Sequence, residues 1–422
     1  MERMVVMKGI KVEGVEIKRD VVPMLKKYIN AEGFQFTISL EKSTGCYIYD
    51  VTNDRYLLDF FGYFGTLALG HNHPAFEDPD FVKNLLIAAI ANPSNSDFYT
   101  EQYWRFVEIF SRMAMGNDFK YAFFIAGGAL AVENALKVAM DWKVQKNFKK
   151  GYTYEKGHKI IHFREAFHGR SGYTLSLTNT DEVKIKYFAK FSWPRITNPK
   201  LFFPLTEENL SKTIELEKRA IEEIKNAFYE NKDDIAAIII EPIQCEGGDN
   251  HFRGEFLKKL RELADENDAM LIFDEVQVGT GSTGKFWCYQ HFGVKPDILA
   301  FGKKMQICGI IVSSRVDEVE HHCLNTRGRI NSTWGGNLVD MVRATKILEV
   351  IEKENLLENA SKMGDYILQQ LNDLASEIGI ISNIRGRGLI CAFDLPDTEM
   401  RDAFLKISLK NDLLLLQGGR KS

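Results

Sequence analysis

Residues 269–303, AMLIFDEVQVGTGSTGKFWCYQHFGVKPDILAFGK, decide the fold. Within this stretch, the apolar runs 269–273 and 297–301 predict two short buried strands. The first run ends at Asp274, and the second is followed by a glycine and then Lys303. An acid and an amine therefore stand at the carboxyl ends of two strands, with the glycine-rich turn GTGSTG between them.

Strand-helix-strand units are repeated along the chain before this stretch. Residues 121–142 pass from a β-rich run through two glycines into a helix-forming segment, and residues 207–232 predict a charged amphipathic helix. The apolar run in 235–244, IAAIIIEPIQ, is typical of a buried parallel strand. This order predicts an α/β fold with a doubly wound, mostly parallel sheet. Open sheets of this kind bind ligands outside the carboxyl ends of their strands, where Asp274 and Lys303 would meet.

An acid paired with an amine suits pyridoxal phosphate. That cofactor needs a lysine to hold its aldehyde and an acid to keep its pyridine nitrogen protonated, so that the ring can withdraw electrons from a substrate carbanion. Each residue also has an ordinary explanation, because a strand-end Asp commonly caps the next turn and a surface Lys is commonly only solvated. The turn at Gly127-Gly128 would present free backbone N–H groups to a phosphate at a helix N-terminus, although such turns also occur without one.

Several long motifs resemble one known family. IFDEVQVGTG (272–281) followed by DILAFGKK (297–304) is similar to the signature of class III (ω-amino acid) pyridoxal-phosphate aminotransferases. AFHGRSGYTLSLTNT, EPIQCEGG and INSTWGGN resemble the branch that acts on the ε-amine of L-lysine. The resemblance runs from about residue 45 to residue 416. It implies pyridoxal 5'-phosphate as cofactor and the PLP-dependent transferase fold type I, with a smaller α/β domain beside the large one.

The resemblance also implies the roles of individual residues around the cofactor. Lys303 and Asp274 would be catalytic, with Lys303 carrying the cofactor and Asp274 keeping its ring nitrogen charged. The other implied cofactor contacts are Gly128 and Ala129 at the phosphate, Phe167 stacked on the ring, Gln277 at the ring hydroxyl, and Thr333, which reaches the phosphate from a second subunit. If Thr333 does so, the working unit is a homodimer with shared sites. A core Phe167 is the alternative for the stacking residue.

Arg170 and Glu246 are the implied substrate-binding residues. Arg170 would bind a substrate carboxylate remote from the reacting amine, and a surface arginine is the alternative. Glu246 matches a movable glutamate that neutralises an arginine beside the uncharged lysine chain and moves aside for the α-carboxylate of glutamate; an exposed loop acid is the alternative. The implied reaction transfers the ε-amino group of L-lysine to 2-oxoglutarate, giving 2-aminoadipate 6-semialdehyde and L-glutamate. The rivals are another ω-aminotransferase, for ornithine or 4-aminobutyrate, and a non-catalytic pyridoxal-phosphate-binding protein.

The last ten residues, LLLLQGGRKS, depart from the family pattern. Family members continue into an R-F-R-P-like segment whose arginine binds the α-carboxylate of the glutamate/2-oxoglutarate pair. We therefore expect a chain shortened at this end, in which Glu246 has no compensating charge. Arg420 is an alternative source of that charge, although it precedes the matching position.

The length of 422 residues fits two or three domains. We expect residues 1–75 to contribute to a small domain, 76–335 to form the large cofactor-binding domain, and 336–422 to form an incomplete C-terminal small domain. A single long amphipathic helix is expected from residue 338, followed by a strand in RGRGLICAFDL (385–395). The segment GYFGTLALGHNHP (62–74) is expected to be a loop at the substrate entrance rather than a metal site, because its two histidines lack further ligands at zinc spacing.

Composition argues for a globular protein. Hydrophobic residues make up 45% of the chain, and 54 Lys and Arg stand against 58 Asp and Glu, which gives no electrostatic footprint for nucleic acid or an anionic membrane. The six cysteines form no C-x-x-C pair, which disfavours a disulfide framework or a zinc site and favours a reducing compartment. The opening MERMVVMKGIKVEG lacks a secretory apolar core, and no apolar run is long enough to cross a bilayer, so we expect a cytoplasmic enzyme.

Overall fold

The computed structural model describes residues 20–422. The opening segment, on which the expectation of no secretory leader depends, lies outside the described residues, as does the first part of the predicted segment 1–75. None of the helices in 20–422 combines the length and the apolar character needed to cross a membrane.

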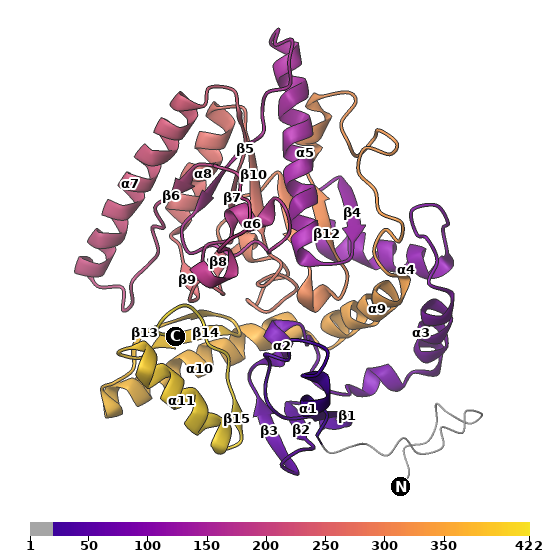
Figure 1. Cartoon of the computed structure of the whole chain (residues 1–422), viewed down its shortest axis with the longest axis vertical. Coiled ribbons are helices and arrows are strands. Elements are labelled where there is room, and N and C mark those ends of the chain that lie inside the picture. Colours follow the sequence, from indigo (N-terminus) through magenta and orange to yellow (C-terminus); the bar gives the residue numbers. More distant parts are fainter. Residues whose placement is uncertain (1–19) are drawn as a thin grey trace.

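A mostly parallel sheet forms the centre of the molecule (Figure 1). β10 is parallel to both of its neighbours, β7 and β11, and β5 is parallel to β7 and β6, whereas β12 runs antiparallel to β11 and β4. In sheet order the strands found in 20–422 are β4 (Tyr121–Ile125), β12 (Cys308–Val312), β11 (Ile298–Phe301), β10 (Met270–Asp274), β7 (Ile235–Ile240), β5 (Lys159–Phe163) and β6 (Arg195–Ile196). The predicted α/β architecture is confirmed.

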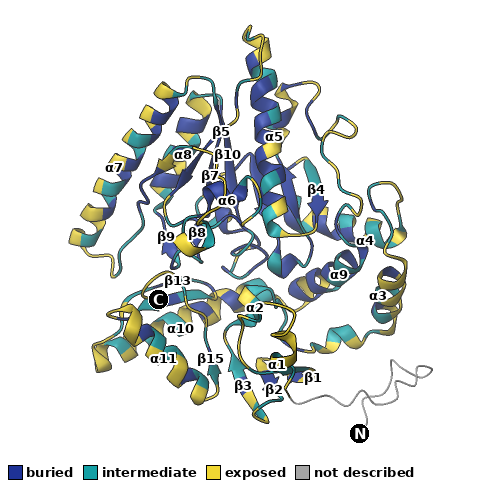
Figure 2. Cartoon of the chain, viewed as in Figure 1, coloured by how far each residue is buried: buried dark blue, intermediate teal, exposed yellow. Residues whose placement is uncertain are grey.

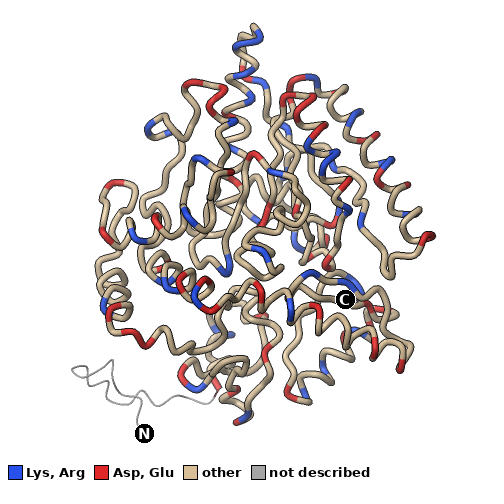
Figure 3. The backbone as a smooth tube through the Cα atoms, turned by 180° about the vertical axis from the view of Figure 1, so that it is seen from behind, with Lys and Arg blue, Asp and Glu red and all other residues tan. Residues whose placement is uncertain are grey.

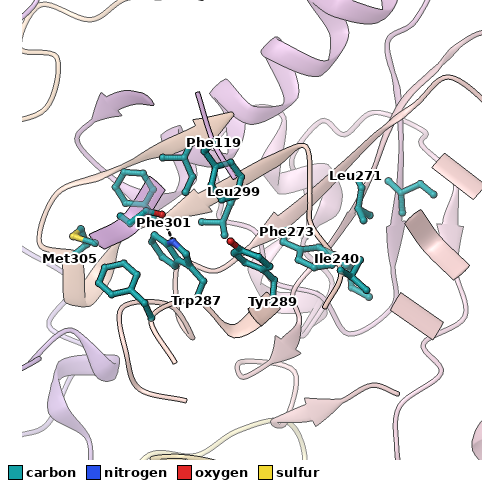
Figure 4. Packing of buried hydrophobic residues seen from close by; sticks show 14 of the residues in the cluster. Phe119, Ile240, Leu271, Phe273, Trp287, Tyr289, Leu299, Phe301 and Met305 are labelled. Atoms are coloured by element: carbon teal, nitrogen blue, oxygen red, sulfur yellow. Dashed lines mark hydrogen bonds between the residues drawn. The ribbon is translucent and has the colours of Figure 1, made fainter. Parts of the chain in front are cut away.

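Each face of this sheet is covered by its own apolar core. Along β10, Leu271 and Phe273 point into one core, and Met270 and Ile272 point into the other, as the period-two geometry of a strand requires. Figure 4 shows the first core, in which the Trp287 ring lies beside Phe301 and its Nε1 donates to the carbonyl of residue 114 at 2.6 Å. Burial on both faces explains why these strands read as continuous apolar runs.

Helices cover both faces of the sheet. α5 (Gly128–Lys149) packs on one face, while α8 (Gly254–Glu266) and α4 (Glu101–Phe110) contribute to the core on the other. The central strands β7, β10 and β11 are buried at every position, whereas α7 (Glu207–Glu230) shows exposed residues along one side (Figure 2). Seen from behind, charges of both signs are interspersed over the helices and loops (Figure 3).

A smaller unit lies beside the carboxyl ends of the central strands (Figure 1). Its first sheet joins β1 (Ile38–Thr44), β2 (Tyr47–Asp50) and β3 (Arg55–Asp59) to β15 (Leu413–Leu414), which pairs in parallel with β3. Its remaining elements are α10 (Leu356–Ile378), β13 (Ser382–Arg387), β14 (Ile390–Asp394) and α11 (Thr398–Lys410). The other helices and strands are α1 (Val22–Leu25), α2 (Gly62–Gly65), α3 (Pro79–Ala91), α6 (Thr174–Leu177), α9 (Leu338–Lys353), β8 (Ile243–Gln244) and β9 (Asn250–His251).

Two predictions for the C-terminal part were wrong. The single helix expected from residue 338 is broken into α9 and α10 at Asn355, whose left-handed φ of 52° ends the regular helical backbone. The single strand expected in 385–395 is an antiparallel hairpin, β13–β14, that turns at Gly388 with a φ of 57°. A Cβ at Gly388 would lie 2.5 Å from the carbonyl oxygen of Ser282, so only glycine fits this close approach.

Candidate active site

Three strand ends bring functional side chains to one edge of the central sheet. Asp274 is the last residue of β10, Lys303 follows β11 by two positions, and Glu241 directly follows β7. Because β10 is parallel to both β7 and β11, these three residues share the carboxyl edge of the sheet. Asp274 and Glu241 are each only 5% exposed. The structure thus places Asp274 and Lys303 at the edge where the sequence predicted them to meet.

Lys303 stands on a strained turn and is hydrogen-bonded. Its φ is 49°, and its Nζ donates to Oε1 of Gln277 at 2.7 Å. Burial lowers the pKa of the Lys303 amine, while nearby acidic groups, Glu246 and Asp274 among them, oppose that shift. A lowered pKa increases the fraction of neutral amine, which is the form that attacks a carbonyl carbon.

Asp274 is held in place by His168. The carboxylate Oδ2 lies 2.8 Å from Nδ1 of His168, and Oδ1 accepts the backbone N–H of Val276 at 3.1 Å. A carboxylate only accepts, so His168 Nδ1 carries the proton. The other ring nitrogen, Nε2, is buried and has no partner within residues 20–422. Sequence reasoning gave His168 no role; its place beside Phe167 was the available signal.

Glu241 is a second buried acid that sequence reasoning left without a role. Its Oε1 accepts the backbone N–H of Phe167 at 2.9 Å. Burial raises the pKa of Glu241 well above its usual value, and the neighbouring Asp274 charge adds to the increase. Glu241 therefore fixes the backbone of the loop that carries Phe167, which is half-buried. A carboxylate directly after a buried strand, as at Asp274, was the signal.

The glycine turn before α5 is tightly packed and has no side-chain cap. Gly127 is the N-cap residue, with a φ of 104°. A Cβ at Gly128 would lie 2.9 Å from Cγ1 of Val276, and a Cβ at Gly169 would lie 2.5 Å from Cβ of Ala129. The first backbone N–H groups of a helix this long carry the positive end of its dipole, so Gly128 and Ala129 offer a site for an anion.

Glu246 has a partner that sequence reasoning missed. Its carboxylate forms an ion pair with Nζ of Lys184, which also lies 5.6 Å from the centre of the Phe167 ring. The expectation that Glu246 carries an uncompensated charge was therefore wrong. Arg420, the alternative cation, has an exposed side chain, and its carbonyl accepts from Arg401.

Arg170 and Thr333 are both exposed in the single chain. Arg170 lies two residues after His168, at the end of the loop whose backbone Glu241 holds. Thr333 lies in the loop before α9, and its carbonyl accepts from the hydroxyl of Ser94 at 2.5 Å. None of the hydrogen bonds described for residues 20–422 joins Thr333 to the glycine turn before α5.

The segment expected as a loop at 62–74 begins with a left-handed turn, α2. Gly62, Tyr63, Phe64 and Gly65 all have φ between 51° and 70°. Such a conformation costs about 1–2 kcal/mol for each residue that has a Cβ, so Tyr63 and Phe64 need support from their surroundings. The turn brings the Phe64 ring to 6.0 Å from Nζ of Lys303.

Lys304, the neighbour of Lys303, binds backbone instead. It is buried, and its Nζ donates to the carbonyl of Gly65 at 3.2 Å and to the carbonyl of Gln277. Burial lowers the pKa of Lys304 to about 8. Its amine is thus committed to two carbonyls, whereas the Lys303 amine meets only the side chain of Gln277 among the described hydrogen bonds.

A family model for class-III aminotransferases matches residues 28–422. The chain is a class-III aminotransferase. It is 46% identical over 391 residues to an L-lysine-epsilon aminotransferase of Amycolatopsis lactamdurans, covering 92% of this chain and 86% of that protein. Its identity to an L-lysine-epsilon aminotransferase of Mycobacterium tuberculosis is also 46%, over 398 residues, 94% of this chain and 88% of that one. A solved structure of lysine aminotransferase from M. tuberculosis in the internal aldimine form superposes with a TM-score of 0.93, at 46% identity, and covers 95% of this chain and 92% of that chain.

Class-III aminotransferases use pyridoxal phosphate, and the residues of this aminotransferase fit it. The turn at Gly128 leaves no room for a side chain and exposes helical N–H groups, which suits the phosphate. Asp274 supplies a buried carboxylate, and Lys303 supplies an amine of lowered pKa. Beside Asp274, the buried Nε2 of His168 has no hydrogen-bond partner among residues 20–422.

Proposed function

We propose that this aminotransferase transfers the ε-amino group of L-lysine to 2-oxoglutarate, giving 2-aminoadipate 6-semialdehyde and L-glutamate. The observation that carries the proposal is the likeness to L-lysine-epsilon aminotransferases over more than nine tenths of the chain. The arrangement of Lys303, Asp274 and the uncapped turn at Gly128 supports the general chemistry.

In this proposal the cofactor is held at both of its ends. When bound, pyridoxal phosphate supplies a protonated pyridine ring that withdraws electrons from the carbon attached to the reacting nitrogen. Asp274 keeps that ring charged, and His168 fixes the orientation of the Asp274 carboxylate. The remaining cofactor-binding residues that we propose are Gly128 and Ala129 for the phosphate, Phe167 for the ring face, Gln277 for the ring hydroxyl, Lys303 for the aldehyde, and Thr333 from the second subunit.

Lys303 is the proposed proton carrier. Its amine takes a proton from the ε-carbon of L-lysine in the first half-reaction, and in the second it delivers one to the carbon that becomes the α-carbon of glutamate. The lowered pKa of Lys303 suits this task, because an amine that carries protons in both directions must exist in both protonation states.

Two different substrates must use one site. Methylene groups flank the ε-amine of L-lysine, whereas a carboxylate flanks the reacting carbon of 2-oxoglutarate. Glu246, paired with Lys184, presents little net charge to the methylene groups, and it is the residue that must move for the carboxylate. Arg170, exposed at the end of the Phe167 loop, is the proposed partner of the remote carboxylate.

We also infer a homodimer and a cytoplasmic location. Exposed apolar side chains gather on α3, on α4 and on the loops beside them. Asn95 joins the loop before α4 to the loop before α9 by donating to the carbonyl of Gly336 at 2.9 Å. The exposed apolar side chains include Leu86, Ile90, Phe98, Tyr99, Trp104 and Trp334. Patches of this kind mark interfaces, and Thr333 lies at this one. The six free cysteines support a reducing compartment.

The test is the absorbance of the purified chain with pyridoxal phosphate, recorded before and after L-lysine and again after 2-oxoglutarate. We expect the yellow band of the bound cofactor to disappear with L-lysine and to return with 2-oxoglutarate. Lys303→Ala should show neither change, and Lys304 would be the active lysine if that variant still turned over L-lysine. A larger response to ornithine or 4-aminobutyrate would replace the proposed donor, and no response to any amine would favour a non-catalytic binding protein.

A further inference from the structure

The left-handed turn α2 is anchored from both sides. On the side of the small unit, Oδ1 of Asp59 accepts the backbone N–H groups of Phe61 at 2.9 Å and Gly62 at 2.8 Å. On the side of the central sheet, Lys304 donates to the carbonyl of Gly65 at 3.2 Å. Gln306 donates to the next carbonyl, that of Thr66, at 2.9 Å. The turn is therefore tied to the segment that directly follows the catalytic lysine.

Lys304 also fixes the residue that Lys303 contacts. Its Nζ donates to the backbone carbonyl of Gln277, while the side chain of the same Gln277 accepts from Nζ of Lys303. Gln277 is thus held by one lysine at its backbone and by the other at its side chain. Displacing the Lys304 amine would release Gly65 and Gln277 together.

We propose that Lys304 is a positioning residue, whose buried amine clamps the turn α2 to the backbone of Gln277 and so sets the distance of the Phe64 ring from Lys303. The clamp is necessary because Tyr63 and Phe64 hold a backbone conformation that side chains disfavour, and such conformations persist only where the surroundings impose them. The kinetic part of the proposal rests on the proposed function, but the structural part does not.

Lys143 provides a matched control. It is also buried, and its Nζ also donates to two backbone carbonyls, those of Asn267 at 3.2 Å and Asp268 at 2.7 Å. It stands on α5 fifteen residues after Gly128, which places it roughly 22 Å along the helix from the active site. Lys143→Met and Lys304→Met therefore remove the same kind of contact, one far from Lys303 and one beside it.

The experiment measures amide hydrogen exchange of the cofactor-free chain in the peptide covering residues 61–67, together with steady-state kinetics. For Lys304→Met we expect exchange in 61–67 to be at least tenfold faster and kcat/KM for L-lysine to fall at least tenfold. Lys143→Met should leave both unchanged. The same exchange in 61–67 and the same kcat/KM in Lys304→Met and the unmodified chain would overturn the proposal, as would an equal change in Lys143→Met.

A second variant covers the case in which Lys304→Met does not fold. Gly65→Ala strains the turn directly, because Gly65 has a φ of 70°, while its Cβ would meet the Lys304 amine only at an ordinary 3.9 Å. We expect faster exchange in 61–67 and a smaller decrease in kcat/KM. Unchanged exchange in Gly65→Ala would contradict the clamp even if the unmodified chain proved inactive toward L-lysine, so the two proposals fail separately.

Discussion

Glu275, the neighbour of Asp274, should support stability and not chemistry. It is 1% exposed, and its two carboxyl oxygens accept the backbone N–H groups of Cys288 at 2.6 Å and Tyr289 at 2.7 Å. Glutamine keeps one acceptor oxygen and turns an NH₂ group toward the other donor. Leaving one buried N–H without an acceptor costs about 1–3 kcal/mol, so Glu275→Gln should lower the free energy of unfolding by that amount. Glu275→Ala removes both acceptors and should cost roughly twice as much.

The assay is urea unfolding of the cofactor-free variants, followed by the fluorescence of the tryptophans. Burial raises the pKa of Glu275 to about 8, with the two N–H groups acting against that shift. An acid whose pKa is raised on folding stabilises the folded chain below pH 4.5, and this contribution is lost as the pH rises to 8. The decrease in the free energy of unfolding caused by Glu275→Gln should therefore become smaller toward pH 8.

Asp274→Asn is the contrasting variant. In the proposed site it would remove a charge-assisted hydrogen bond to the cofactor ring, about 1.5–3 kcal/mol, and should lower kcat about 10- to 160-fold. Folded Glu275→Gln should keep kcat within about threefold, which is less than 1 kcal/mol. The reasoning would be refuted if Glu275→Gln unfolded at the same urea concentration as the unmodified chain, or lost as much kcat as Asp274→Asn.

Three further predictions follow from contacts elsewhere in the chain. Burial lowers the pKa of Lys143 from 10.5 to about 8. Its charge should therefore destabilise the folded chain by up to about 3 kcal/mol below pH 8 and cease to do so toward pH 10.5. The free energy of unfolding in urea should rise with pH across that range, and it should rise less steeply in Lys143→Met. Gly128→Ala should weaken cofactor binding about tenfold, because its Cβ would lie 2.9 Å from Val276, and adding Val276→Ala should restore most of the affinity in a fluorescence titration. Lys184→Met should raise the KM for 2-oxoglutarate about two- to fivefold, the effect of losing a partly exposed ion pair with Glu246, and equal KM values would contradict that role.

The central strands of the sheet were predictable because each consists largely of consecutive apolar residues, which indicate burial. β7 and β10 are apolar at nearly every position, so local sequence alone indicates a strand covered on both faces. Asp274 ends β10 and Lys303 follows the equally apolar β11, so their position at the carboxyl edge of the sheet was also predictable.

The missed features depend on partners far away in the chain. The turn α2 places two aromatic residues in a conformation that no propensity predicts, and one of its anchors, Lys304, comes 239 residues after Gly65. The bond from the Phe167 backbone to Glu241 spans 74 residues. The break at Asn355 is the exception, because asparagine is itself a local signal for a helix end, weaker than glycine.

The pairing of β3 with β15 has a consequence for synthesis of the chain on the ribosome. Leu58 of β3 is paired with Leu413 of β15, so the partner of β3 emerges about 350 residues later. At about 5–20 residues per second, β3 waits roughly 20–70 s with an open edge. An unpaired strand edge is a template for joining another chain, so nascent copies on one messenger are exposed to each other throughout that interval. Slow translation should therefore increase aggregation of this enzyme, and a chaperone that covers strand edges should suppress it.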